Sequence, residues 1–257
     1  MSPPPPPPPP DDNSDNDTGA ASDSVTTISP SHASFLFSSF TNFLTIAIHS
    51  ILYTRKLYPP ATFLSTRAYG LPVHQSRHPG LCGWIRDAVA ATSSQLRSGT
   101  VRHVALVVHA PSSLAVVERW IFDVQSFPAF ASAAATATTS VDSAADEQQQ
   151  PQLSSETTVN ANEALRGALA RLAHTGQSLD ALPDGECTFT LAVELRDSAE
   201  APIRHPQVWI PSEPDNQAAG NRPPGTTTLA SSTVPVRSVQ AGPLFFECWV
   251  ERVKTQP

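Results

Sequence analysis

An uncharged segment of 18 residues, 35–52 (FLFSSFTNFLTIAIHSIL), constrains the fold more than any other feature of this sequence. It falls just short of the length that spans a bilayer. Seven of its residues are Ser, Thr, Asn or His, which is a heavy polar load for a helix that faces lipid. We therefore predict a helix from about Ser34 to Leu57 that is buried on most sides within a soluble domain, in preference to a membrane span.

Two further helices are predicted from apolar spacing and from their end residues. The segment Pro79–Leu96 begins with proline, which suits the first helical turn, and Trp84 belongs to its apolar face. A third helix is predicted to begin at Asn160, where Glu163 completes a capping box, and to close at Gly176.

Alternation of apolar and polar residues predicts five strands. The first two are joined by a short Pro-Ser-Ser loop and read as a hairpin. The predicted strands are Val101–His109, Ala115–Val124, Glu186–Leu195, Val234–Val239 and Leu244–Val253. Three helices, interrupted and followed by strands that pair through hairpins, predict an α+β fold with helices on one face of a mainly antiparallel sheet.

Low-complexity segments divide the chain. Residues 1–33, with eight consecutive prolines and then five aspartates, are expected to be a disordered tail, and residues 34–254 to form one domain. Mobile insertions are expected at about 131–158 and 212–232. The net charge is −7, and without the five aspartates of the tail the remaining 18 acids and 16 bases leave −2. This balance excludes a polybasic nucleic-acid binder, because phosphate affinity depends on clustered Lys and Arg.

The three cysteines, Cys82, Cys187 and Cys248, lie far apart and form no CxxC pair. Such usage is typical of a reducing compartment, where cysteine packs as a small apolar residue. The N-terminus is rich in proline and aspartate, so we expect no signal peptide.

Sequence motifs of catalysis are missing. The chain contains no GxSxG, GxxxxGK[ST] or GxGxxG motif. His74 and His78 have the spacing of two zinc ligands on a helix, but they lie in a segment predicted to be extended. We predict that the protein is not an enzyme, with no catalytic residue, no metal site and no cofactor.

The last predicted strand carries an anomaly. Its apolar face is regular, but the opposite face holds Trp249 between Glu247 and Glu251. Either a neighbouring strand half-covers the indole, or the indole is an exposed anchor for another protein, since Trp is frequent at binding hot spots. Trp209, between two prolines, can either pack internally or cover a bound peptide.

Five short segments carry a resemblance to a known family. They are FLTIAIHSILYTRKLYP (43–59), YGLPV (69–73), HP (78–79), CTFT (187–190) and WVER (249–252). In these segments the chain resembles the HORMA-domain accessory subunits of DNA polymerase zeta, a branch of the family of mitotic spindle assembly checkpoint-like HORMA proteins. The resemblance covers about residues 35–128 and 160–254, and the low-complexity insertions suggest a fungal type.

The resemblance implies a HORMA fold and the function of an adaptor in translesion DNA synthesis. Such proteins hold a proline-containing peptide of the polymerase's catalytic subunit against a sheet edge and wrap a C-terminal safety belt around it, here about residues 206–257. A second surface receives a Rev1-type scaffold polymerase. The implied location is the nucleus, with the cytoplasm as a further site, and no strong nucleic-acid binding and no membrane are expected.

The family also implies roles for particular residues. Tyr69 and Trp209 match positions that contact the captured peptide. Glu247 and Trp249 match positions that face the scaffold polymerase, where the family commonly has an amide and a tyrosine. Arg166 matches an arginine used in pairing between two HORMA domains, although an ordinary solvated arginine explains it equally well.

Other functions are weighed beside this one. A HORMA adaptor for another client, in the spindle checkpoint, in meiotic chromosome axes or in DNA-end protection, would share the fold. An enzyme would need a pocket with convergent titratable groups.

Overall fold

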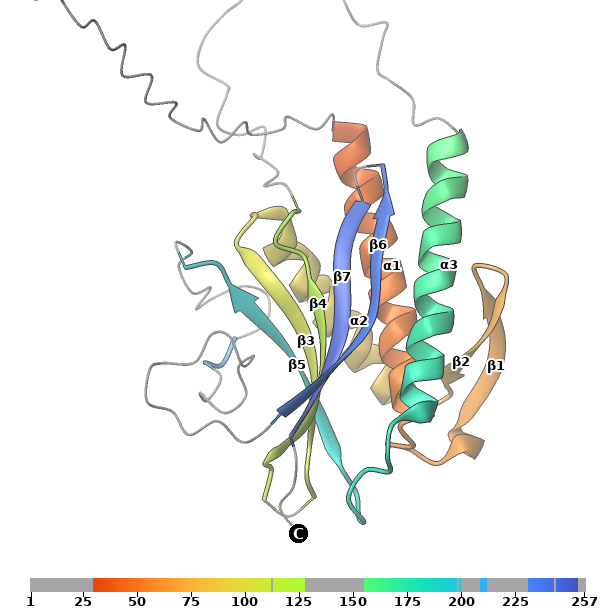
Figure 1. Ribbon diagram of the computed structural model, residues 1–257, viewed down its shortest axis with the longest axis vertical. Coiled ribbons are helices and arrows are strands. Elements are labelled where there is room, and N and C mark those ends of the chain that lie inside the picture. The colour runs from red at the N-terminus through yellow and green to blue at the C-terminus, as the bar shows by residue number, and fades with distance from the viewer. Residues whose placement is uncertain are drawn as a thin grey trace, which may run out of the picture.

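The computed structural model describes residues 30–111, 113–127, 155–197, 199, 209–211, 231–242 and 244–253. A five-stranded antiparallel sheet in the order β5-β3-β4-β7-β6 is covered on one face by three helices, and a separate hairpin, β1–β2, packs on α1 (Figure 1). The predicted α+β class is therefore confirmed. The elements are α1 (Pro30–Thr54), β1 (Phe63–Ala68), β2 (Leu71–Ser76), α2 (Pro79–Arg97), β3 (Val101–His109), β4 (Val116–Asp123), α3 (Ser155–Ser178), β5 (Thr188–Leu195), β6 (Ser231–Ala241) and β7 (Leu244–Val253), with a 3-10 turn at Pro60–Thr62.

Helix α1 is the centre of the core. It contacts both α2 and α3, and its large apolar side chains are fully buried, among them Phe37, Phe40, Phe43, Leu44 and Ile48. The stretch His32–Thr54 is long enough for a membrane span, with a mean hydropathy of 1.5, but most of it is buried inside the protein. The structure therefore supports the predicted buried helix.

Helix α1 ends three residues before the predicted Leu57. The Leu57 N–H donates to the Leu52 carbonyl at 3.0 Å and the Lys56 N–H to the Tyr53 carbonyl at 3.1 Å, while Lys56 adopts a left-handed φ of 56°. These two bonds define a Schellman motif, which satisfies the last carbonyls of the helix before the prolines are reached.

Helix α3 differs from its prediction at both ends. It begins at Ser155, so that Asn160 lies inside the helix and does not cap it, and Gly176 lies within the last turn. The capping pattern at Asn160 predicted a start that is too late, because residues 155–159 contain no residue that breaks a helix and the helix extends through them. Gly176 is required for close packing: a Cβ there would collide with the side chain of Thr54 on α1.

Two glycine substitutions test this packing. Gly176→Ala should lower the free energy of unfolding by about 1–3 kcal/mol, because the Thr54 hydroxyl is held by the Ser50 carbonyl at 2.9 Å and cannot easily move. Gly83→Ala in α2 should instead raise it by about 0.5–1 kcal/mol, since its Cβ would meet only Arg86 Nη2 at 3.7 Å. Urea unfolding measures both, and equal effects would contradict the close approach.

The strand predictions are largely confirmed. β3 and β4 pair as the predicted hairpin, and β7 has the predicted bounds. β5 and β6 lie at opposite edges of the sheet, four strand spacings or about 19 Å apart. The connecting residues 196–230 therefore join one edge of the sheet to the other.

Most of the segments that would define the predicted domain boundaries lie outside the described residues. Residues 1–29 of the tail, most of the two insertions and most of the belt segment before Ser231 lie outside the described residues. Within the described part, α1 starts at Pro30, inside the predicted tail, and α3 starts inside the first predicted insertion.

Candidate partner-binding site

Strand β5 is an edge strand. It pairs along its length with β3, and the described residues place no strand on its other side. None of its side chains is fully buried. The outward N–H and C=O groups of such a strand can pair with an added peptide strand.

Aromatic side chains, two of them exposed, gather beside this edge. Phe189 of β5 contacts Trp84 of α2, with ring centroids 5.1 Å apart and nearly perpendicular planes, and Tyr58 after α1, at 6.3 Å. Trp84 is 43% exposed and Tyr58 37%. We call these three residues the aromatic cluster. Its exposed ring faces offer a surface for apolar or proline side chains of a bound peptide.

The aromatic cluster was not predicted from the sequence. Trp84 was predicted to lie on the apolar face of its helix, but it is 43% exposed, because no described element covers it and β5 is the edge of the described sheet. Only the pairing of β5 with β3 brings Phe189 beside α2. One sequence feature could have indicated that Trp84 is exposed: it follows Gly83 and is an aromatic residue on an otherwise aliphatic helix face.

The described residues show no contact between Tyr69 and Trp209. Tyr69 and Gly70 form the turn between β1 and β2, both with positive φ (49° and 74°). Tyr69 is half-buried against the core, and burial raises its pKa. Its hairpin lies well apart from β5 (Figure 1). Trp209 is half-buried, and its indole N–H is buried with no hydrogen-bond partner in the described part of the chain.

Glu247 and Trp249 lie on the face of the sheet that is turned away from the helices. Glu247 is exposed, whereas Trp249 is half-buried and its ring meets His103 edge-on at 5.6 Å. The indole N–H donates to Glu251 Oε1 at 3.2 Å. A small apolar group beside it includes Ala105 and Ile121. Neighbouring strands therefore half-cover the indole and leave part of it accessible.

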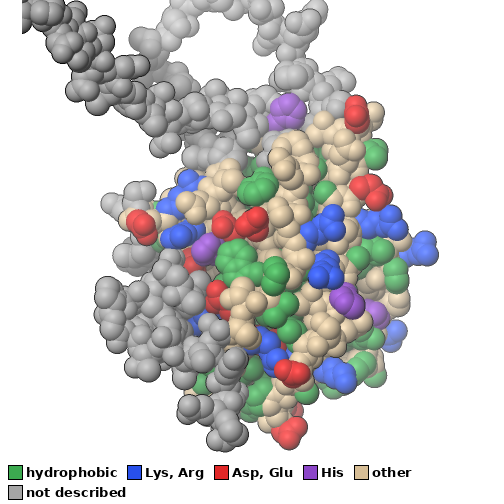
Figure 2. All heavy atoms as spheres, in the orientation of Figure 1, with side chains coloured by type: hydrophobic (Ala, Val, Ile, Leu, Met, Phe, Trp, Pro, Cys, Tyr) green, Lys and Arg blue, Asp and Glu red, His purple; other side chains and the backbone are tan. Residues whose placement is uncertain are grey.

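Charged residues surround Trp249 on this face. His103 Nδ1 lies 2.8 Å from Glu194 and Nε2 lies 3.6 Å from Asp123, which is directly opposite Glu247 in the strand register. Figure 2, in the orientation that places β7 in front of α1, shows acidic, basic and hydrophobic side chains intermixed. Arg166 is exposed on α3 and pairs with Glu163 at 3.2 Å.

Two ion pairs join β7 to β4, one of them half-buried at Arg252. Glu118, with no exposed surface, lies opposite Arg252, whose Nε is 3.1 Å from Oε1. Arg119 lies opposite Glu251, with Nη1 3.0 Å from Oε2. Adjacent residues point to opposite faces of a sheet, so one ion pair lies on each face. The C-terminal hairpin is therefore joined to β4 by an ion pair on both faces of the sheet.

His74, His78 and Cys248 have structural roles. His78 caps α2 by accepting the Leu81 N–H at 3.1 Å, and His74 stacks on Tyr53. Among the described residues, no group of three His, Cys, Asp or Glu side chains could hold a metal ion. Burial raises the pKa of the Cys248 thiol to about 12, which keeps it protonated and unreactive.

Comparisons with known proteins agree with this architecture. The HORMA domain family matches residues 38–233. The chain is 31% identical over 221 residues to the DNA polymerase zeta processivity subunit of Schizosaccharomyces pombe, covering 83% of this chain and 91% of that protein. It is 28% identical over 178 residues to the human mitotic spindle assembly checkpoint protein MAD2B, covering 65% of this chain and 72% of that protein.

Solved structures show the same fold. A chain of the mitotic checkpoint complex matches with a TM-score of 0.60 and 20% identity, over 84% of this chain and 97% of that one. Caenorhabditis elegans HTP-2 bound to an HTP-3 closure motif matches with a TM-score of 0.56 and 13% identity, over 88% and 89%. This chain therefore belongs to the HORMA family, and its sequence is similar to the polymerase zeta branch of it.

Proposed function

We propose that this protein is the non-catalytic accessory subunit of a translesion DNA polymerase zeta. It clamps a proline-containing peptide of the catalytic subunit at the free edge of β5, with the aromatic cluster as the side-chain site. The observation that carries this proposal is a strand edge that no described strand pairs, lying beside the aromatic cluster, in which Trp84 and Tyr58 are exposed and Phe189 is half-buried. Similarity to a polymerase zeta processivity subunit over most of both chains supports the choice of client.

The chain path supports capture under a belt. Because β5 and β6 occupy opposite edges, residues 196–230 join the two sides of the sheet, and the belt we propose spans about 206–257 with Trp209 within it. A client strand on β5 enclosed by this segment dissociates only after the segment moves, so dissociation is slow. For Tyr69, a contact with the captured peptide is proposed from the family resemblance alone.

A second partner, a Rev1-type scaffold polymerase, is proposed for the face that carries Glu247 and Trp249. The half-accessible indole with carboxylates beside it suits an anchor at an interface with a polar rim. Arg166, exposed on α3, is proposed as a contact between two HORMA domains. We place the protein in the nucleus, where its proposed partners act on DNA.

Co-purification tests the proposal directly. The full chain should form a stable complex with a proline-containing fragment of the polymerase zeta catalytic subunit, and limited proteolysis should show protection after Pro206. The alternative, a HORMA adaptor for a checkpoint, meiotic-axis or end-protection client, is supported by the MAD2B relatives. A complex with such a client and none with the polymerase fragment would favour that alternative.

Replacing Trp84 should weaken client binding without unfolding the protein. For Trp84→Ala we expect the affinity for the catalytic-subunit fragment to fall about thirtyfold or more, as for a hot-spot residue worth about 2 kcal/mol. The side chain is 43% exposed, so stability should change little. Isothermal titration calorimetry measures the affinity and urea unfolding measures the stability.

Trp249→Ala is the reciprocal variant. It should weaken the contact with the scaffold polymerase and leave the affinity for the catalytic-subunit fragment unchanged. If either substitution weakened both partners equally, the division of the surface into two sites would be wrong.

A further inference from the structure

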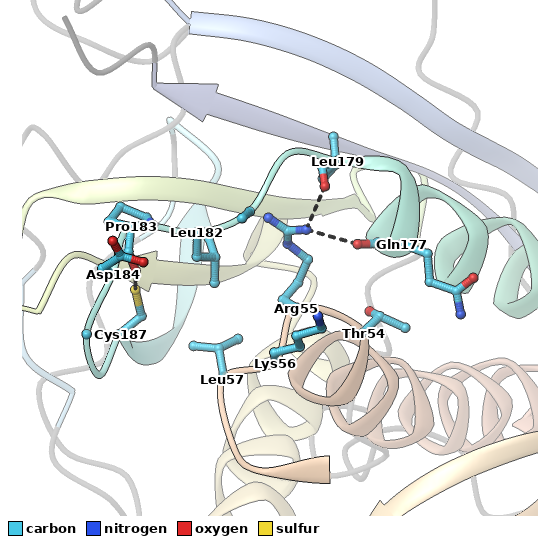
Figure 3. A pocket seen from close by; sticks show the side chains of 13 residues that line it. Thr54, Arg55, Lys56, Leu57, Gln177, Leu179, Leu182, Pro183, Asp184 and Cys187 are labelled. Carbon is cyan, nitrogen blue, oxygen red and sulfur yellow. Dashed lines mark hydrogen bonds between the residues drawn. The ribbon is translucent and has the colours of Figure 1, made fainter. Parts of the chain in front are cut away.

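A pocket of about 340 Å³ lies beside β5 at the ends of α1 and α3 (Figure 3). It is built by the last turns of the two helices and by the loop that leads into β5. Its wall includes Thr54, Leu57, Gln177, Leu179, Leu182 and Cys187.

The pocket is continuous with the proposed client site. Leu57 in its wall directly precedes Tyr58 of the aromatic cluster. Cys187, also in its wall, directly precedes Thr188, the first residue of β5. A peptide that pairs with β5 and continues past Thr188 therefore runs toward the segment that lines this pocket.

The N–H donors of Arg55, at the floor of the pocket, already have hydrogen-bond acceptors within the protein. The five N–H groups of Arg55 donate to both carboxylate oxygens of Glu118 (3.0 and 2.7 Å) and to the carbonyls of Gly176, Leu179 and Asp180 (2.9, 3.3 and 2.7 Å). A guanidinium has five donors, so none remains for a phosphate or carboxylate ligand. The buried cation therefore closes the pocket and does not recruit an anion.

One wall of the pocket is aliphatic, whereas Thr54, Gln177 and the charged Lys56 and Asp184 line other parts of it. The side chains of Leu57 and Leu182 extend toward the same space, with Pro183 beside them (Figure 3). Burial raises the pKa of the Cys187 thiol, so this wall is uncharged as well. The exposed side chains of Lys56 and Asp184 carry opposite charges, which gives no net preference for a charged ligand.

We propose that this pocket is a second subsite for the captured peptide and receives an aliphatic side chain from the residues that flank the β5-paired section. The subsite rests on the proposed function, since it needs a client strand on β5. It adds a specificity determinant that the aromatic cluster alone does not provide, because the client must carry an aliphatic residue at a fixed distance from the section held by Phe189.

Two peptides and three variants of the full chain test the subsite. The probes are the proline-containing fragment of the catalytic subunit with its flanking residues and the same fragment trimmed to the section that pairs with β5. For Leu182→Glu we expect the affinity for the flanked fragment to fall about tenfold or more, with the trimmed fragment unaffected. Leu182→Ala should have the same selectivity with a smaller effect, and Val159→Glu, on an exposed aliphatic residue in the first turns of α3, is the matched control.

The possible results separate the subsite from the function on which it rests. Equal losses for both fragments would show that Leu182 only supports the aromatic cluster, and no loss in either Leu182 variant would show that the pocket is empty in the complex; both overturn the subsite alone. If the unchanged protein binds neither fragment, the proposed function is wrong and the subsite falls with it.

Discussion

Replacing Glu118 with glutamine is expected to lower the free energy of unfolding by about 3–5 kcal/mol, the usual cost of breaking a buried ion pair by removing one partner. Glu118 has no exposed surface, and Arg55 beside it is only 6% exposed. The substitution keeps the shape of the side chain and removes the charge that both Arg55 and Arg252 face. Since a whole domain is stable by only about 5–15 kcal/mol, this loss is a large fraction of the total.

The arrangement of the bonds explains the size of this effect. Glu118 Oε1 accepts Arg55 Nη2 at 2.7 Å and lies 3.1 Å from Arg252 Nε, while Oε2 accepts Arg55 Nε at 3.0 Å and the Trp120 indole N–H at 3.3 Å. Arg55 also holds the end of α3 through the Gly176 carbonyl. One carboxylate thus connects the ends of two helices with the C-terminal strand, and its loss affects all three.

Urea denaturation at neutral pH measures the effect, and Asp180→Asn is the matched control. Asp180 also pairs with Arg252, at 2.7 Å, but its side chain is 91% exposed. Exposed ion pairs contribute about 0–1 kcal/mol, so the control should stay within that range. A loss below about 1 kcal/mol for Glu118→Gln would show that water reaches the pair and that the hairpin is not fastened by it.

Local patterns in the sequence were sufficient for most elements of the fold. The β7 alternation placed Leu244, Phe246, Cys248 and Val250 on the apolar face, and all four are buried. Helix α2 differs from its prediction by one residue, because Pro79 and an apolar face mark it clearly. These features depend on residues close in the chain, where period and end chemistry suffice.

Features that depend on distant segments could not be predicted in this way. The exposure of Trp84 is decided by Tyr58 and Phe189 and by the position of β5 at an edge, none of which helical spacing records. The pairing of Glu118 with Arg252 requires the sheet order, and neither charge stands out in the sequence. Gly176 was predicted to end its helix. A glycine is needed there because the position packs against Thr54 of α1, which the local sequence does not record.

Replacing Phe246 with alanine is expected to cost about 3–5 kcal/mol of stability, whereas Phe245→Ala should cost less than about 1 kcal/mol. The two phenylalanines are neighbours in β7 but point to opposite faces of the sheet. Phe246 has no exposed surface and contacts the rings of Phe40 at 5.2 Å and Phe43 at 5.1 Å on α1. Phe245 is 36% exposed.

This contrast tests whether the C-terminal hairpin is anchored to α1 through a single apolar face. A register slip of one residue would exchange the two side chains between the faces and place Glu118 opposite a residue other than Arg252, so packing and charge specify the same pairing. Hydrogen exchange of β6 and β7 should therefore accelerate together in Phe246→Ala, with little change in Phe245→Ala. Equal exchange in the two variants would mean that the hairpin is held by its strand pairing alone.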